Sequence, residues 1–454
     1  MPKRYNIEIF DSSESICYYP VSFSSNSDIP NRISFGSKQT AVICKKQPNG
    51  RNVISISSKL AKELNFPLLV TTITLFESEH SLVIGPLVGI FSSGFTQFPI
   101  NPIGERSSFF AKLLSIHSSI GVVPFLFGEE HIDWDKQLIK GYFYNKDGWR
   151  QITVPFPNVI YDRLPNRKSE KLKKSRIVKE KMEKKFYIPW YNPGFFNKLD
   201  IYDRLYNDKK VALYLPETFA FTSLHQIENM LSKYGHIYVK PINGSLGLGV
   251  HQIIYDSKSN HYYCRYHDSK NHLLKFASLE SLINHVFVNK NLNRMLVQQG
   301  INLIKINHRS VDFRVHANKD EHGIWKISAI AAKVAGNGSP TTHVKNGGEI
   351  RTIKEIFVNK EEQNKYQKLL EHAALDLAIS LEKHLKGIIG EIGFDFGIDT
   401  KGNVWLFEAN SKPGRSIFSH PNLKDSDLLT RKLTLSYSIF LTEKYMNKNK
   451  ELLQ

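Results

Sequence analysis

The chain has 454 residues, of which 41% are hydrophobic and 23% charged, a composition typical of folded globular proteins and not of disordered ones. Its length favours several domains, because a single core rarely serves more than roughly 250–300 residues. No apolar stretch is long enough to cross a bilayer, and no apolar run follows the basic residues at the start. We therefore expect a cytoplasmic protein without a membrane span.

The formal net charge of +18 is compatible with a polyanionic partner. A good share of that charge lies in one segment, 167–185, where three glutamates interrupt the lysines. This pattern favours a solvated helix or linker over a docking strip for an acidic polymer or nucleic acid. The three cysteines lack CxxC spacing, which indicates reduced thiols and neither a disulfide nor a zinc framework.

Residues 1–128 consist of short apolar runs separated by Gly, Pro, Ser and Asn, which predicts a β-rich N-terminal module. One helix is expected in this region, over residues 57–64. The next segment, 129–210, contains the basic stretch and the aromatic-rich sequence IPWYNPGFFNK. We interpret it as a connector that packs against its neighbours.

Beyond residue 210 the alternation of strands and helices becomes clearer. Lys198 stands at the start of a predicted helix, which is followed by a short strand leading to Pro216. A second strand, HIYVK, ends at Lys240 and runs into the glycine-rich loop PINGSLGLGV. Glycines let backbone N–H groups close on phosphate oxygens, and a lysine adds a point charge. The loop matches neither a Walker A nor a dinucleotide fingerprint, so a plain hairpin turn is an equally good interpretation of it alone.

The sequence MLVQQG predicts a strand that ends at a hinge, where the backbone of Gln298, Gln299 and Gly300 can face an adenine. In the following strand Asp312 and Arg314 share one face. They form either a structural salt pair or a phosphate-facing arginine held by its aspartate. Farther along, leucines and alanines between 361 and 385 recur at helical spacing, which predicts an amphipathic helix covering a sheet.

The most informative stretch is EIGFDFGIDTKGNVWLFEANSKPG, residues 391–414, which predicts a hairpin with a TKGN turn. If Asp399 pairs with Val404, then Asp395 lies opposite Glu408. Like charges so placed destabilise a hairpin unless a cation lies between them. Mg²⁺ fits, because it prefers oxygen ligands, and Asn410, on the Glu408 face of a regular strand, offers an amide oxygen. The alternative is an exposed acidic hairpin neutralised by lysines.

Taken in order, these features resemble an ATP-grasp domain over about residues 198–445. The resemblance rests on Lys198, Pro216 and Thr218, the Lys240 strand, the glycine loop, the Gln-Gln-Gly hinge, the sequence DFR, Gly347 and Gly348, and the 391–414 hairpin. The wider chain, with IGPLVGIF, NVIYDRLPNR and NSKPGRSIF, is similar to the YheC/YheD family of endospore-coat-associated ATP-grasp proteins.

The resemblance implies an α/β (α+β) protein with an ATP-grasp fold, in which two α+β subdomains sandwich ATP. The N-terminal module and the connector precede these subdomains in the chain. The nucleotide-lid subdomain would span residues 211–300 and the metal-binding catalytic subdomain 301–454. ATP would be bound by Lys198, Lys240, Gly244, Ser245, Gly247 and Gly249, with adenine against the backbone of Gln298, Gln299, Gly300 and Ile301. Mg²⁺, or Mn²⁺ as the alternative ion, would be held by Asp395, Glu408 and Asn410. Arg314 and Lys333, with Lys240, would face the transferred phosphoryl group.

ATP-grasp enzymes typically move the γ-phosphoryl group of ATP onto a carboxylate, and an amine then attacks the acyl phosphate. The resemblance thus implies a carboxylate–amine ligase acting on a peptide or envelope component in spore coat or envelope formation. The alternative is an ATP-binding scaffold for coat assembly with little turnover, with spore coat proteins as its partners. Nucleic-acid binding through residues 167–185 is the least favoured function.

Overall fold

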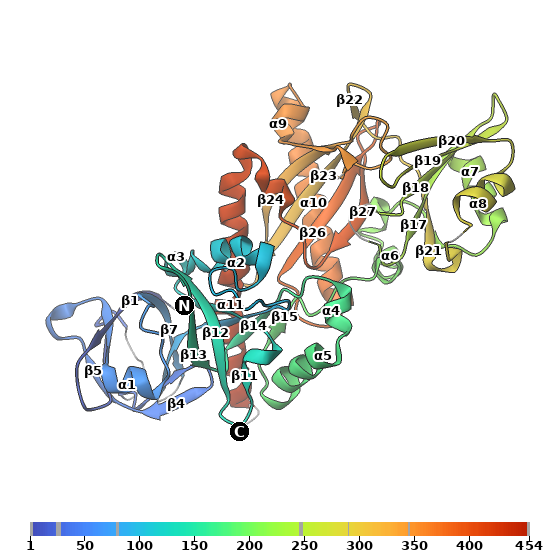
Figure 1. Cartoon of the computed structure of the whole chain (residues 1–454). Coiled ribbons are helices and arrows are strands. Elements are labelled where there is room, and N and C mark those ends of the chain that lie inside the picture. The colour runs from blue at the N-terminus through green and yellow to red at the C-terminus, as the bar shows by residue number, and fades with distance from the viewer. Residues whose placement is uncertain are drawn as a thin grey trace.

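The computed structural model describes residues 3–23, 29–78, 81–244, 248–288, 290–343 and 346–451. Within these residues the strands form four sheets, two in each half of the chain. Figure 1 shows the N-terminal sheets, in blue to teal, on one side and the C-terminal sheets, in green through yellow to orange, on the other. None of the helices in the described ranges is both long enough and apolar enough to span a membrane.

The first sheet has the strand order β4-β3-β8-β7-β1-β6-β2-β5. Its strands are β1 (Lys3–Phe10), β2 (Ile16–Tyr19), β3 (Arg32–Phe35), β4 (Lys38–Ala41), β5 (Ile43–Lys46), β6 (Val53–Ser57), β7 (Thr72–Ser78) and β8 (Ser81–Gly85). The helix expected over 57–64 is confirmed as α1 (Ser58–Glu63), which begins where the Ser57 hydroxyl accepts the Leu60 N–H. The three cysteines are buried and free, as predicted.

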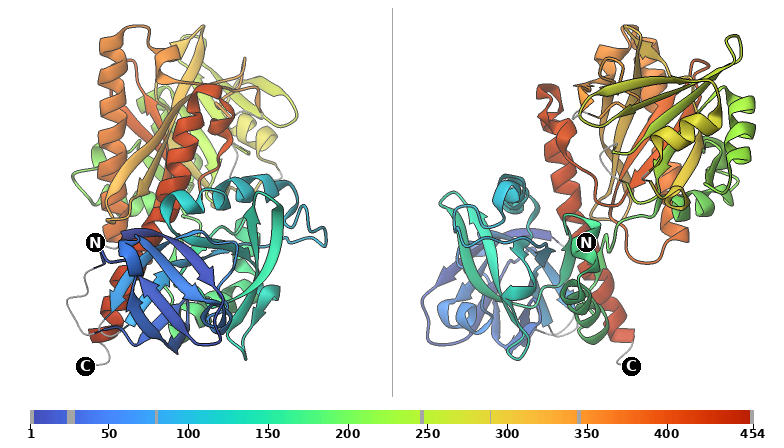
Figure 2. Two further views of the ribbon diagram at one scale, coloured as in Figure 1. Left: turned by 90° about the vertical axis from the view of Figure 1, so that its left-hand side faces the viewer. Right: turned by 45° about the vertical axis from the view of Figure 1, so that its right-hand side comes forward.

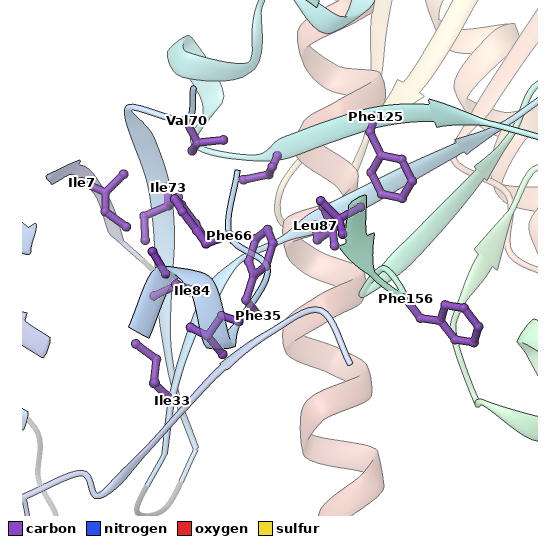
Figure 3. Close-up of a cluster of buried hydrophobic side chains, with 14 of the residues drawn as sticks. Ile7, Ile33, Phe35, Phe66, Val70, Ile73, Ile84, Leu87, Phe125 and Phe156 are labelled. Carbon is purple, nitrogen blue, oxygen red and sulfur yellow. The ribbon is translucent and has the colours of Figure 1, made fainter. Parts of the chain in front are cut away.

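The second sheet has the order β11-β12-β10-β9-β14-β15, with β13 beside β12. Its strands are β9 (Leu87–Phe91), β10 (Val123–Phe127), β11 (Ile132–Asp133), β12 (Leu138–Asn145), β13 (Gly148–Pro155), β14 (Val159–Asp162) and β15 (Trp190–Tyr191), and its helices are α2 (Ser107–Leu114), α3 (His117–Ile120), α4 (Arg167–Lys171) and α5 (Lys173–Glu180). The two sheets share a core, in which Phe35 and Ile73 of the first meet Leu87 and Phe125 of the second (Figure 3). The second sheet thus continues across residue 128, and the domain boundaries stay a prediction.

The third sheet has the order β16-β21-β17-β18-β19-β20. It consists of β16 (Thr218–Ala220), β17 (His236–Pro241), β18 (His251–Asp256), β19 (His261–His267), β20 (Asn271–Phe276) and β21 (Met295–Gln299), with helices α7 (Leu224–Tyr234) and α8 (Leu279–Val286) packed against it. The strands expected at HIYVK and MLVQQG are thereby confirmed as β17 and β21. The strand expected before Pro216 is wrong, because residues 212–214 form a 3₁₀ turn between buried Val211 and Leu215.

The fourth sheet has the order β25-β24-β23-β26-β27, with β22 beside β23. Its elements are β22 (Lys305–Ile306), β23 (Arg309–Lys319), β24 (Trp325–Val334), β25 (Glu349–Arg351), β26 (Glu391–Ile398), β27 (Val404–Asn410), α6 (Lys198–Tyr206), α9 (Ile353–Ile356), α10 (Lys360–His384) and α11 (Lys424–Glu451). Helix α10 is the amphipathic helix expected between 361 and 385, and Leu370, Leu377 and Leu381 pack on the inward faces of β23 and β26.

Helix α11 connects the two halves (Figure 2). Its first turns contact β23 and β24, whereas Leu435, Tyr437 and Ile439 lie in the core of the second sheet. Beside it, the buried Glu391 accepts hydrogen bonds from Tyr161 and from Arg163 of the N-terminal half. Burial alone would raise the pKa of Glu391, but Arg415 and Arg163 outweigh burial and lower it.

Candidate active site

A β-bulge shapes the predicted metal hairpin. Val404 pairs with Ile398 and not, as expected, with Asp399. Asp395 nevertheless lies opposite Glu408, because the register shifts by one residue between Asp395 and Phe396. A regular strand would also put Val404 and Leu406 on the face of Glu408 and Asn410, and the bulge prevents this. Val404 and Leu406 pack in the core, whereas Glu408 and Asn410 lie on the Asp395 face beyond the extra residue Phe407.

Asp395 is the centre of a row of charges that crosses the sheet. Its two carboxylate oxygens accept from Arg314 Nε at 2.9 Å and from Arg314 Nη2 at 2.8 Å. Lys333 Nζ donates to the same carboxylate at 2.8 Å, and Asn410 Nδ2 lies 3.4 Å away. Burial alone would raise the pKa of Asp395, but Arg314 and Lys333 hold it well below its usual range.

The partner of Arg314 differs from the predicted one. Arg314 and Asp312 do share a face of β23, but Arg314 is held by Asp395 across the ladder to β26. Asp312 instead faces Lys333, whose Nζ lies 2.9 Å from Asp312 Oδ1 as an ion pair without hydrogen-bond geometry. Burial raises the pKa of Asp312, and Lys333 opposes this shift. The bases Arg314 and Lys333 therefore alternate with the acids Asp395 and Asp312 across β24, β23 and β26.

Lys240, at the end of β17 in the third sheet, reaches strand β27 of the fourth sheet. It is buried, and its Nζ donates to Gln298 Oε1 at 2.7 Å and to the carbonyl of Phe407, the extra residue of the bulge, at 3.3 Å. Burial, and then repulsion by Lys198, lower the pKa of Lys240 to about 7. An anion placed beside this amine would restore its charge.

Lys198 approaches from a third direction, because it is the first residue of α6. The Asn197 side chain caps this helix by accepting the N–H groups of Leu199 and Asp200. Lys198 is 9% exposed at its side chain, and its Nζ lies 3.7 Å from Glu408 Oε1. The charged cluster thus consists of the carboxylates of Asp395 and Glu408 and four basic side chains around them, Lys198, Lys240, Arg314 and Lys333.

Sequence reasoning missed Tyr202, which links these elements. Its hydroxyl lies 2.8 Å from the Leu406 carbonyl and 2.9 Å from the Phe407 carbonyl, and Gln298 Nε2 lies 2.8 Å away. Burial raises the pKa of Tyr202 above its ordinary value. The signal was present in the sequence, since Tyr202 lies four residues after Lys198 and therefore on the same face of α6.

In the predicted adenine hinge, backbone N–H groups already donate hydrogen bonds to other backbone carbonyls. Gln298 lies within the ladders of β21, Gln299 N donates to Glu217 O at 2.8 Å, and Gly300 N donates to His236 O at 3.0 Å. The contribution of Gln298 to the charged cluster is instead its side chain, which binds Lys240. Ile301 is buried directly after the hinge. Adenine contacts from this segment stay a prediction.

The glycine loop follows β17. Gly244 N donates to Pro241 O at 3.2 Å, and Gly249 has φ +72°, a conformation that favours glycine. A Cβ placed on either glycine would meet atoms of Pro241. Ser245 and Gly247 lie outside the described residues.

The residues around Asp395 and Glu408 fit a hard divalent cation. The described ranges hold no cluster of three His, Cys, Asp or Glu side chains suited to a metal, so an amide must complete the set. Asn410 supplies one on the same face, and Glu408 keeps a 29% exposed side chain whose ion pair with Lys198 is long. Two carboxylates and an amide oxygen are ligands that Mg²⁺ accepts.

Comparison with known proteins identifies the family of this chain. The family model described as YheC/D like ATP-grasp matches residues 187–441. The chain is 38% identical to the Endospore coat-associated protein YheD of Bacillus subtilis (strain 168), over 98% of this chain and 97% of that protein. It is 23% identical to the Endospore coat-associated protein YheC of the same organism, over 68% of this chain and 86% of that one.

Among solved structures, the D-alanine-D-alanine ligase from Coxiella burnetii matches 81% of this chain and 97% of its own, at 10% identity and a TM-score of 0.46. That level of overall similarity carries no argument about function. The family match covers more than half of the chain, and the YheD match covers nearly all of it. The chain therefore belongs to the YheC/D-like ATP-grasp family, and its fold is the ATP-grasp fold.

Proposed function

We propose that the chain is a Mg-ATP-dependent carboxylate–amine ligase that works through an acyl phosphate. The observation that carries this proposal is the convergence of four basic side chains on Asp395 and Glu408 from four separate elements, α6, β17, β23 and β24. Buried cations arranged around opposed carboxylates suit the phosphate chain of a nucleotide bound together with a divalent ion. The third sheet would form the lid subdomain over 211–300, and the fourth the catalytic subdomain over 301–454.

Each cation has a distinct proposed task. Lys198 and Lys240 neutralise the phosphates of ATP, and the low pKa of Lys240 lets that amine take up its proton as the anion arrives. Arg314, fixed by two bonds to Asp395, presents its remaining N–H groups to the transferred phosphoryl group. Lys333, pinned between Asp312 and Asp395, keeps that arginine oriented. Such a reaction depends on positioning and charge neutralisation more than on a protein nucleophile.

Asp395, Glu408 and Asn410 would hold Mg²⁺, or Mn²⁺. When bound, the ion neutralises charge that builds up on the phosphate oxygens.

The reaction balances in two steps. A carboxylate oxygen of the substrate forms a bond to the γ-phosphorus, and the bond from that phosphorus to the β–γ bridging oxygen breaks, which releases ADP. The amine then attacks the acyl carbon, inorganic phosphate leaves, and the nitrogen loses a proton. The products are an amide, ADP and phosphate.

The test is to incubate the full-length protein with Mg-ATP and a panel of amino acids, short peptides and envelope precursors, while ADP is measured. ADP that forms only with one acid–amine pair supports the ligase and identifies its substrates. Tight ATP binding without ADP under every condition contradicts it.

That second result would favour an ATP-binding scaffold for spore coat assembly. Two observations support this alternative: both curated relatives are described as endospore coat-associated, and Asp395 is already neutralised by Arg314 and Lys333. In the scaffold, coat proteins would be the partners and ATP a ligand that is bound without being consumed.

A further inference from the structure

A cavity of about 350 Å³ lies at the junction of the two halves, outside the charged cluster. It is lined by β14, α4, α5, the segment from Trp190 to Phe195, and Asn243. Figure 2 shows α4 and α5, in green, where the halves meet. A cavity of this size is in the range of small-ligand sites.

Two residues close in the chain to the proposed nucleotide site lie at the cavity: Asn243 lines it, and Lys412 contacts its wall. Asn243 follows Lys240 by three residues, so their Cα atoms lie within about 11 Å of each other. On the other side Lys412 follows the proposed metal ligand Asn410 by two residues, and its Nζ lies 4.7 Å from the centre of the Phe195 ring in the cavity wall. A ligand in the cavity therefore lies beside the phosphate-binding lysine and the metal-binding strand.

The cations of the cavity are only partly neutralised. Four of its lining residues are basic and two are acidic. One acid, Asp162, already pairs with buried Lys412, and the other, Glu170, accepts the Phe195 N–H at 3.2 Å. Arg167 and Lys179 donate to backbone carbonyls, and the Glu183 carboxylate also attracts Lys179.

The remaining two cations have no partner in the described part of the chain. Lys171 and Arg176 are exposed and form no hydrogen bond or ion pair there. Behind them the inner wall is apolar, where Phe91 and Trp190 pack with ring centres 5.1 Å apart. The cavity thus combines a cationic rim with an apolar floor.

We propose that this cavity binds the carboxylate substrate, and that the substrate is an acidic peptide whose side-chain carboxylates reach Lys171 and Arg176. The inference rests on the proposed ligase function, which requires a carboxylate beside the phosphate site. Arginine matches carboxylate geometry, and the apolar floor suits the methylene groups of glutamate side chains.

The binding test uses the full-length protein and tetra-glutamate, with tetra-glutamine as the neutral probe and inorganic phosphate as a competitor, at fixed ionic strength. Binding is measured by calorimetry in the absence of ATP. Tetra-glutamate should bind about tenfold or more tightly than tetra-glutamine. No binding of tetra-glutamate, or its displacement by equimolar phosphate, would overturn the proposal.

The matched variants lie close together in the sequence, on α4 and α5. Lys171→Gln with Arg176→Gln removes the two free cations of the rim, and Lys173→Gln with Lys174→Gln removes two exposed lysines that do not line the cavity. The first pair should weaken tetra-glutamate binding about tenfold or more and the second less than about threefold. Equal losses in both would show a general attraction to positive charge and refute the site.

These outcomes separate the two proposals, because peptide binding needs no turnover. Selective binding that the first pair of substitutions abolishes, without ADP from any acceptor, would support the cavity and contradict the ligase. ADP release driven by another acid, with a KM that the first pair leaves unchanged, would support the ligase and refute the cavity.

Discussion

Asp395 lies directly opposite Glu408 in the ladder between β26 and β27, one position beyond a shift in register. If the register that begins at Ile398 and Val404 continued unchanged, Asp395 would face Phe407, and Glu408 would point into the core. The single extra residue in β27 is what turns the Glu408 carboxylate outwards. Any metal site here depends on that bulge as much as on the acids themselves.

Glu408→Gln should reduce Mg-ATP turnover about a hundredfold or more, because it removes a charge from the proposed metal set. Thermal stability should change little, since among the described residues Glu408 forms one ion pair, the long one with Lys198. ADP release and a melting curve on the same sample measure both effects.

Asp399→Ala is the matched control on the same hairpin. Asp399 accepts the N–H groups of Lys401 and Asn403 and the indole N–H of Trp405. Its loss should cost about 1–3 kcal/mol of stability and leave turnover of the folded protein within about twofold. If Asp399→Ala abolishes turnover while Glu408→Gln does not, the metal assignment is wrong.

ATP binding should take up a proton near pH 8. Lys240 has a pKa of about 7 in the free protein, so it is mostly neutral there, and bound phosphate favours its charged form. Uptake should approach about one proton near pH 8 and fall towards zero well below pH 7, where the amine is already charged. ATP affinity should accordingly decrease as the pH rises through 7. Calorimetry in buffers of different ionisation enthalpy measures this uptake.

Lys240→Arg provides the control, because a guanidinium stays charged at every accessible pH. The variant should bind ATP without this proton uptake, even if its affinity is lower. Uptake that persists unchanged in Lys240→Arg would assign the titration to another group.

Tyr202→Phe should destabilise the protein by about 1–3 kcal/mol, because two buried carbonyls of β27 and the Gln298 amide lose a partner. The same change loosens the bulge, so the KM for ATP should rise as well. Tyr206→Phe on the same helix is the control, since Tyr206 is 75% exposed. Urea unfolding of both variants, followed by ATP titration, distinguishes them; equal stabilities would contradict the bridging role.

Glu391→Gln should cost about 3–5 kcal/mol, because Arg163 and Arg415 would be left buried without their counter-ion. The exposed Glu362→Gln on α10 should leave stability nearly unchanged. Urea unfolding monitored by fluorescence tests both. A midpoint for Glu391→Gln equal to that of the parent chain would refute the ionic tie between the halves.

Much of the local structure followed from the sequence. The turn residues TKGN predicted the hairpin of β26 and β27, and the leucine spacing predicted α10, because both patterns are set by backbone geometry over a few residues. The bulge at Phe407 could not be found in the same way, because an extra residue leaves the same letters in the same order. The opposition of Asp395 and Glu408 was predicted correctly from an incorrect register.

The partner of Arg314 shows a second limit. Asp312 was the obvious candidate, being two residues away on the same strand. The actual partner, Asp395, is 81 residues away and becomes a neighbour only because β26 pairs with β23. Strand order is decided by the whole chain, and a single motif does not contain it.

Helix α11 limits which parts of this protein can be exchanged by recombination. Its buried residues Leu435, Tyr437, Ile439 and Leu441 complete the core of the second sheet, although most of the helix lies within the region matched by the family. A gene that kept only residues 187–441 would leave those side chains without most of the strands that bury them, because β9 to β14 lie before residue 187. The ATP-grasp region therefore cannot be moved between proteins as an independent unit. A recombination that replaced the N-terminal sheets would have to replace α11 as well.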